Sequence, residues 1–299
     1  MIIVCGEALI DLVPTGAEDT WRAVPGGGPA NTAVAVARLG TPVRLLCRLS
    51  RDGFGRRLRD HLTANGVDLG LAVEAAEPTT LAVVDLDEHG SADFRFSMEK
   101  TADWQWTPGE LPGSLPPGTR ALHVGSLASV VPPGAAVLRT WAAGHRDAVT
   151  VVYDVNVRPA VLPGREPYLE QVEAWLRVAH IVKASEEDLA WLHPERDPLD
   201  TARAWLAEHG LDLVLVTRGA AGAVALSCDG PPIAADGVAV RVVDTVGAGD
   251  AFTGAFLHGS MDRGMPLAES LRYAVRAAAL TCTREGAAPP SRAEVDAGL

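Results

Sequence analysis

The chain has 299 residues, 47% of them hydrophobic, which is enough to bury the core of one large α/β domain with or without a smaller appendage. A net charge of -12 and an isoelectric point near 5.1 argue against a general nucleic-acid or anionic-membrane surface. The chain has no signal-like or membrane-length apolar stretch, which predicts a cytoplasmic protein, and no CxxC pair, which predicts buried free thiols at Cys5, Cys47, Cys228 and Cys282.

The first 70 residues alternate between strand and helix patterns. Residues 2–5 form a continuous apolar run that predicts a buried strand, and residues 29–39 predict a helix that Gly40 ends. Residues 43–49 predict a second strand, and apolar positions within residues 54–62 mark one face of a second helix. This β-α-β-α order predicts an α/β domain with parallel strands.

Residues 71–100 break the alternation. They read as two strands about a turn at residues 88–90, with no helix between them. Paired with residues 13–24, this hairpin would form a small sheet that stands off the main domain as a lid. Such a sheet leaves apolar surface exposed in a monomer, so we expect a homodimer in which the partner's lid covers it. We assign the main domain to residues 1–12, 25–70 and 104–299, and the lid to residues 13–24 and 71–103.

The remainder of the chain returns to alternating strands and helices. Strands are expected near residues 121–124, 149–154, 180–183, 213–217 and 238–243, and helices around residues 169–177, 186–193, 198–209 and 266–285. Strands separated by helices favour parallel pairing with helices on both faces. The sequence therefore predicts a three-layer α-β-α sandwich with a mostly parallel central sheet and a small β lid.

The strongest chemical signal is VVDTVGAGDAFTGAF at residues 242–256. Helical spacing of the apolar residues after the glycines places three small residues in the first turn of a helix: Gly247, Ala248 and Gly249. Unpaired amides and the positive end of the helix dipole can bind a phosphate there. An acid beside a phosphate repels it, so Asp250 suggests a base that takes a proton from an attacking hydroxyl. Two alternatives are a tight turn that Asp250 merely caps, and a dinucleotide loop, which would need glycine at Phe252.

Polar residues also follow other predicted strands. Asp11 and Asn31 fall in loops that leave successive elements of the sheet, where together they could bind vicinal hydroxyls of a sugar. Asn156 and Arg158 close the strand that ends at Asp154, and the arginine could reach a transferring phosphate. The alternative for each is structural, as a cap, a helix start or a solvated strand end.

Two further segments follow predicted strands. KASEEDL at residues 183–189 leads from a strand into a helix start with Ser185 and three acids, and an N-cap whose acids favour the helix dipole is the preferred interpretation. VTRGAAG at residues 216–222 is a strand that runs into a glycine turn, a shape that suits backbone lying against a nucleotide and is also common in hairpins.

Together these segments, in this order, resemble the PfkB or ribokinase-like family of carbohydrate kinases over nearly the whole chain. The matching stretches are GEALIDLVP at 6–14, GGGPANTAVAVARLG at 26–40, DGFG at 52–55, DVNVRP at 154–159, VTRG at 216–219 and DTVGAGDAF at 244–252. The first two look most like fructokinases. The resemblance implies a ribokinase-like fold and transfer of the γ-phosphoryl of ATP to a sugar hydroxyl, with fructose the first choice. Ribose and 2-keto-3-deoxygluconate are alternatives, and a catalytically silent sugar or nucleotide sensor is the alternative of another class.

The resemblance also implies residue roles. Asp250 becomes the catalytic base beside an anion hole of backbone amides. We expect sugar contacts from Asp11, Gly27, Gly28, Asn31 and Asn156. We expect nucleotide contacts from Lys183, Ser185, Thr217, Gly219, Gly222 and Gly249.

The expected cofactors are ATP and Mg²⁺, with K⁺ as a further candidate. Asp188 occupies the place of the family's metal-organising glutamate and would act through water, while Asp244 matches the position associated with a monovalent-cation loop. Two departures stand out: Ser185 replaces the asparagine of the same motif, and Val275 stands where many relatives carry an asparagine near the adenine.

Overall fold

The computed structural model describes residues 1–16, 20–86, 92–162 and 164–298. Its centre is a large sheet with the strand order β14-β13-β12-β11-β10-β9-β1-β4. From β4 to β12 every neighbouring pair is parallel, and β13 and β14 add an antiparallel edge. The strands are β1 (Ile2–Cys5), β4 (Val43–Leu46), β9 (Ala121–Gly125), β10 (Thr150–Asp154), β11 (Ile181–Ser185), β12 (Leu213–Thr217), β13 (Ala223–Ser227) and β14 (Ile233–Ala235).

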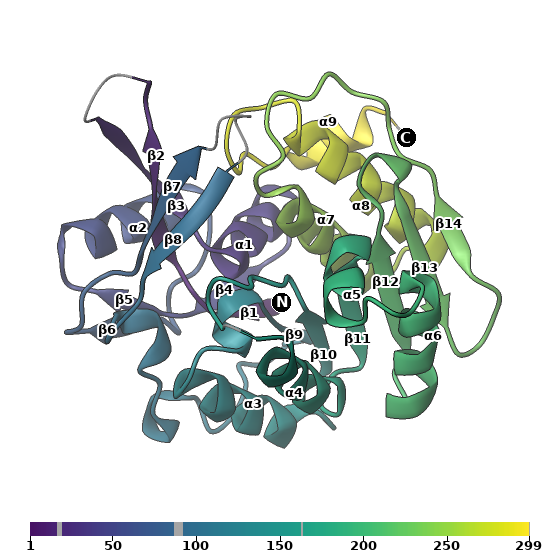
Figure 1. Cartoon of the computed structure of the whole chain (residues 1–299), viewed down its shortest axis with the longest axis horizontal. Helices are drawn as coiled ribbons and strands as arrows, with labels where there is room; N and C mark the ends of the chain where they lie inside the picture. Colours follow the sequence, from purple (N-terminus) through teal and green to yellow (C-terminus); the bar gives the residue numbers. More distant parts are fainter. Residues whose placement is uncertain (17–19, 87–91, 163, 299) are drawn as a thin grey trace.

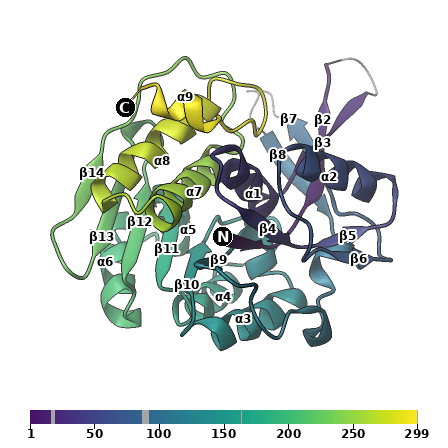
Figure 2. The ribbon, with the colours of Figure 1, turned by 180° about the vertical axis from the view of Figure 1, so that it is seen from behind.

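Helices cover both faces of this sheet, as Figures 1 and 2 show from opposite sides. One hydrophobic cluster joins the sheet to α1 (Gly28–Arg38), α7 (Ala248–Leu257), α8 (Leu267–Thr281) and α9 (Arg292–Asp296). A second cluster joins the other face to α3 (Gly134–His145), α4 (Arg165–Leu176), α5 (Glu186–Leu192) and α6 (Pro198–His209). The three-layer α-β-α sandwich predicted from the sequence is therefore confirmed.

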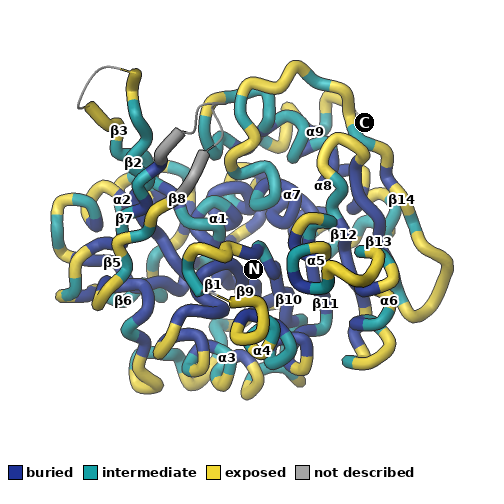
Figure 3. The backbone as a smooth tube through the Cα atoms, viewed as in Figure 1, coloured by how far each residue is buried: buried dark blue, intermediate teal, exposed yellow. Residues whose placement is uncertain are grey.

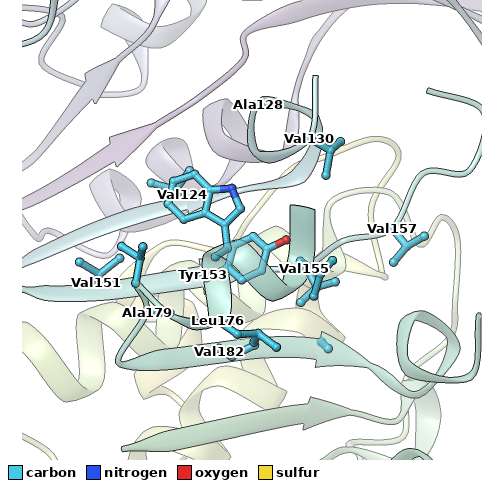
Figure 4. Close-up of a cluster of buried hydrophobic side chains, with 14 of the residues drawn as sticks. Val124, Ala128, Val130, Val151, Tyr153, Val155, Val157, Leu176, Ala179 and Val182 are labelled. Carbon is cyan, nitrogen blue, oxygen red and sulfur yellow. The ribbon is translucent and has the colours of Figure 1, made fainter. Parts of the chain in front are cut away.

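Strand β10 shows why the central strands read as continuous apolar runs. Successive side chains of a strand point to opposite faces, so Tyr153 enters one cluster while Val152 enters the other. Tyr153 stacks on Trp175 of α4 with ring centroids 5.6 Å apart, and Figure 4 shows it among Val155, Leu176 and other apolar side chains. Burial on both faces holds the carboxyl end of β10, and with it the loop that follows, in a fixed position.

A smaller four-stranded sheet stands beside the sandwich (Figure 1), in the order β3-β2-β7-β8. Its strands are β2 (Leu9–Pro14), β3 (Trp21–Gly26), β7 (Leu81–Leu86) and β8 (Ala92–Ser97). Strand β2 pairs with β7 in parallel through Ile10, Asp11 and Leu12, so the sheet includes residues just before the predicted lid segment 13–24. The turn predicted at residues 88–90 lies outside the described residues. Next to the sheet lie α2 (Gly53–Ala64) and the paired strands β5 (Arg48–Ser50) and β6 (Val73–Ala75).

One predicted strand is divided in two, and another is wrong. The run predicted at residues 43–49 breaks at Cys47, because β4 belongs to the large sheet while β5 pairs with β6. The strand predicted at residues 238–243 is instead an extended loop after β14, and Val242 and Val243 are each 60% exposed. Their β-branched side chains are typical of a strand, which is why the sequence predicted one here. The antiparallel edge of the sheet is instead formed by β13 and β14.

Figure 3 shows buried residues concentrated in the strands of the large sheet and exposed residues on the connecting segments. The cysteines fit this division only in part. Cys5 and Cys47 are buried free thiols as predicted, whereas Cys228 is exposed at the end of β13 and Cys282 is half-buried after α8. In the described part of the chain, the helices are all too short or too polar to span a lipid bilayer.

Candidate active site

The predicted sugar and catalytic residues meet at the carboxyl ends of the parallel strands. β1 lies between β4 and β9, so the chain leaves β1 first to one side and later returns to the other. Such a switch point opens a crevice in which ligands of α/β proteins bind. Segments that follow β1, β9 and β10 enter this crevice, and the start of α7 closes it.

The start of α7 has the geometry of an anion site. Gly247 is the N-cap at φ 76°, and a Cβ there would lie 2.6 Å from the Cβ of Ala287, so only glycine fits. The amide of Ala248 donates to the carbonyl of Thr245, but those of Gly249 and Asp250 have no partner among the described residues. Two free donors thus lie at the positive end of the helix dipole.

Asp250 faces Asn31 across the crevice. The side-chain amide of Asn31 donates to Oδ2 of Asp250 at 2.9 Å, which joins α1 to α7. Burial raises the pKa of Asp250 to about 6, while the bond from Asn31 and the charges of Lys183 and Arg158 partly oppose that rise. A carboxylate with a pKa just below neutral is ionised at pH 7 and well matched to accept a proton.

A second acid, Asp11 of β2, lies close to this pair. Burial raises the pKa of Asp11 to about 7, the negative charge of Asp250 raises it further, and Arg158 lowers it. A Cβ on Gly26 of the neighbouring strand β3 would lie 2.1 Å from Oδ2 of Asp11, so glycine leaves room for the carboxylate. Two acids and one arginine therefore share the crevice.

Gly28 and Asn156 complete this end of the site. A Cβ on Gly28 would lie 3.3 Å from both Nδ2 of Asn156 and Oδ1 of Asp250, so the absence of a side chain keeps the space between them open. Asn156 has the left-handed φ of 38° and donates to the hydroxyl of Ser126, which has a φ of 57°. Gly27, at φ 103°, packs against the carbonyl of Glu7, where a Cβ would lie 2.7 Å away. Such backbone conformations are costly and gather at functional sites.

The buried ammonium group of Lys183 lies against the first turn of α7. Nζ of Lys183 lies 3.1 Å from Oδ1 of Asp154, and the hydroxyl of Thr253 donates to the other oxygen of Asp154 at 2.9 Å. Burial alone would lower the pKa of Lys183, but the charges of Asp154 and Asp188 outweigh it and raise the pKa. A Cβ on Gly249 would be 3.2 Å from Nζ, so this ammonium group lies directly beside the predicted anion hole.

A large pocket adjoins the crevice. It has a volume of about 890 Å³ and begins at Asn156, Arg158, Lys183 and Gly249. From there it extends between the loop at residues 237–242 and the carboxyl-terminal half of α8. The predicted nucleotide residues all line this pocket: Lys183, Ser185, Thr217, Gly219, Gly222 and Gly249. Its size suits a nucleoside triphosphate whose phosphates point toward Asp250.

The described residues hold no group of three or more His, Cys, Asp or Glu side chains that could cage a metal ion. Both oxygens of Asp188 already accept amides at 2.8 Å, from Ser185 and Val157. Those of Asp244 accept amides from Val246 and Gly286. This arrangement fits an ion that keeps most of its waters and binds chiefly through phosphates, as Mg²⁺ does. The assignments of both residues to ions stay predictions.

Three contacts were not found from the sequence. Ser126 follows β9 and accepts the amide of Asn156, Thr253 links Asp154 to the carbonyl of Gly249, and Trp191 lines the pocket. Ser126 and Thr253 lie within ordinary apolar patterns, so no local signal separates them from core residues. The left-handed φ of Ser126 is visible only in the structure.

A three-layer α/β sandwich with an acid at a glycine-lined helix start, next to a nucleotide-sized pocket, defines a phosphotransferase that acts on small molecules. The family model described as pfkB family carbohydrate kinase matches residues 1–294. The chain therefore belongs to the pfkB family of carbohydrate kinases. Fructokinase-1 of Zea mays is 35% identical over 311 residues, which cover 99% of this chain and 96% of the relative.

Solved structures agree with this assignment. Fructokinase from Vibrio cholerae O395, bound to fructose, ADP and a calcium ion, has a TM-score of 0.88 at 31% identity and covers 99% of this chain and 97% of its own. Fructokinase from Xylella fastidiosa with bound ATP has a TM-score of 0.91 at 29% identity, with the same coverage. The protein is an ATP-dependent carbohydrate kinase, as the sequence predicted.

Proposed function

We propose that the protein is a fructokinase that uses ATP with Mg²⁺. The observation that carries the proposal is the 2.9 Å bond from Asn31 to Asp250, because it supports a role for Asp250 as a base between a polar crevice and the phosphate end of the pocket. Several fructokinases, from plants and bacteria, are among the relatives, and one solved fructokinase holds fructose and ADP together. The polar groups of the crevice suit a small molecule rich in hydroxyls.

Each residue of the crevice has a separate role in the proposed reaction. Fructose lies against Asp11, Asn31 and Asn156, with the backbone of Gly27 and Gly28 leaving room for its ring. Asp250 accepts the proton of the attacking hydroxyl, which forms its bond to the γ-phosphorus as the bond from that phosphorus to the β-phosphate oxygen breaks. ADP leaves with the displaced oxygen.

Charge on the transferring phosphoryl group is balanced by the amides of Gly249 and Asp250 and by the cations of Lys183 and Arg158. Mg²⁺, when bound, would neutralise charge on the ATP phosphates, and Asp188 and the exposed Glu187 of the pocket wall would hold its waters. The loop that holds Asp244 would hold a monovalent cation such as K⁺, whose charge would add to the positive end of α7.

The small sheet acts as a lid over the sugar, and two copies of it form a homodimer. An ion pair between Arg22 of β3 and Glu285 after α8 links this sheet to the loop beside Gly247, which supports closure across the crevice. Closure excludes water, which the base would otherwise activate to hydrolyse ATP. Saturating fructose should therefore suppress hydrogen exchange in residues 71–86, and light scattering should give the mass of a dimer. A monomer whose exchange ignores fructose would refute both ideas but leave the kinase intact.

A sugar panel tests the substrate. ADP formation is measured with fructose, ribose, 2-keto-3-deoxygluconate and glucose, each with ATP and a titration of Mg²⁺. We expect the highest kcat/KM with fructose and no turnover without a divalent cation. The Asp250→Asn variant controls for contaminating kinases. A higher kcat/KM with another sugar would overturn the fructose assignment, and sugar binding with no turnover on any of them would favour the silent sensor.

A further inference from the structure

We propose that the base end of the nucleotide pocket does not select adenine, and that the enzyme also uses other purine nucleoside triphosphates, such as GTP and ITP, as phosphoryl donors. The inference rests on the proposed kinase function and concerns the donor, whereas the sugar panel concerns the acceptor. It depends on an asymmetry between the two ends of the pocket, which the lining residues reveal.

The phosphate end is rich in fixed polar groups. Lys183 is buried and held by Asp154, Arg158 lies at the mouth, and the amides of Gly249 and Asp250 are free. These groups contact the triphosphate, which is identical in ATP, GTP and ITP. Most of the binding energy is therefore available to any nucleoside triphosphate.

The opposite end is formed by aliphatic side chains. The loop after β14 contributes Val238, Val240 and Val242, and α8 contributes Val275, Ala278 and Ala279. None of these side chains can donate or accept a hydrogen bond. They offer a purine ring a flat apolar contact on its faces, which adenine, guanine and hypoxanthine satisfy about equally.

Two polar side chains among the described residues lie near this end, but neither can distinguish adenine from guanine. Thr245 is exposed, and its carbonyl accepts the amide of Ala248, so it belongs to the phosphate end. Cys282 is half-buried, and its carbonyl accepts the amides of Val243 and Asp244. Its side chain is a thiol, which is a weak donor and a weak acceptor. Neither supplies the paired donor and acceptor that distinguish the edge of adenine from that of guanine.

The backbone of the loop could still read the edge of the base. Between the end of β14 at Ala235 and the bond from Val243 to Cys282, however, residues 236–242 belong to no strand or helix. Each peptide group carries both a donor and an acceptor, and none of these residues uses its groups in a strand ladder, so the loop offers both kinds of group to the edge of a base. This loop can therefore present an acceptor to the amino group of adenine or a donor to the carbonyl of guanine.

The magnitude of discrimination follows from these contacts. A site built to hydrogen-bond a substrate group rejects the analogue that lacks it by about 10⁴-fold or more, whereas an apolar pocket discriminates by only about 10- to 100-fold. We therefore expect kcat/KM values for GTP and ITP within about 100-fold of the value for ATP.

The first test compares ATP, GTP and ITP as donors at saturating fructose, with fructose phosphate measured as the product. The second test compares the dissociation constants of ADP and GDP by calorimetry. GTP and ITP should support turnover within the stated range, and the dissociation constants of ADP and GDP should differ by no more than about 100-fold. A preference for ATP above about 10³-fold would overturn the inference while the kinase function stood. No turnover with any donor would instead refute the proposed function.

A matched pair of variants tests whether the lack of hydrogen-bonding side chains at the base end is the reason that GTP and ITP are used. Ala278 is half-buried and lines the pocket wall, so a larger side chain there would extend into the pocket. Ala278→Asn adds an amide and should change the ratio of ATP to GTP use by about tenfold, the value of one hydrogen bond, while the similarly sized Ala278→Leu should not. An equal change of that ratio in both variants would show that shape selects the donor, contrary to the inference.

Discussion

Replacing Asn31 with alanine should move the pH dependence of the reaction. Asn31 donates to Asp250 at 2.9 Å, and that bond holds the pKa of the carboxyl below the value that burial alone would give. A hydrogen bond to a charged group is worth about 1.5 to 3 kcal/mol, and one pKa unit corresponds to about 1.4 kcal/mol. Because Asp250 faces an open crevice, water replaces part of the lost bond. We therefore expect the smaller effect, a rise of about one unit.

The sign follows from the role of the base. Only the ionised carboxylate accepts a proton, so kcat/KM for the sugar falls as the pH drops through the pKa of Asp250. For the wild type this acid limb is expected near the value of about 6. In Asn31→Ala it should lie near pH 7. Asp11 also titrates near pH 7 and is coupled to Asp250 by charge, but it is present in both proteins, so the difference between the two profiles reports the loss of Asn31.

The assay is a profile of kcat/KM against pH from 5 to 9, in which fructose phosphate is measured directly so that coupling enzymes do not distort it. Asn156→Ala is the matched control, because Asn156 lies in the same crevice but bonds to Ser126 and not to Asp250. It should raise KM for the sugar without moving the acid limb. An Asn31→Ala profile that overlays the wild type would refute the assignment of Asp250 as a base tuned by Asn31.

Three further outcomes are expected. Asp250→Asn keeps the size of the side chain but removes the base, so kcat should fall by about 10²- to 10⁴-fold with the melting temperature little changed; wild-type kcat would disprove the role. Asp11→Ala removes a half-buried hydrogen-bonding group worth about 1 to 3 kcal/mol, so KM for the sugar should rise much more than KM for ATP, and equal rises would mean that Asp11 is not in the sugar subsite. Reversing the charge of Arg22 should weaken sugar affinity by about fivefold or less, since exposed pairs contribute about 1 kcal/mol or less, and adding Glu285→Arg should restore it. Arg51→Glu, which breaks an exposed ion pair elsewhere, is its control.

Local periodicity predicted most of the fold. The helix expected at residues 198–209 is α6 with the same bounds, and the strand expected at residues 213–217 is β12. Both patterns depend on which face of a single element is buried, and that information lies in neighbouring residues. Periodicity wrongly predicted a strand at residues 238–243, because Val238, Val240 and Val242 of the pocket wall are β-branched like the valines of a strand.

The sequence by itself determined the fold class, the order of the motifs and the choice of Asp250 as the candidate base. Only the tertiary structure decided which of these residues meet. Asn31 and Asp250 are 219 positions apart, and Lys183 and Asp154 are 29 apart, yet each pair is in direct contact. Contacts of this kind depend on strand order, since β1, β9, β10 and β11 end at one edge of the sheet and bring their loops together there. A local pattern specifies an element and its buried face, but not the element that lies beside it.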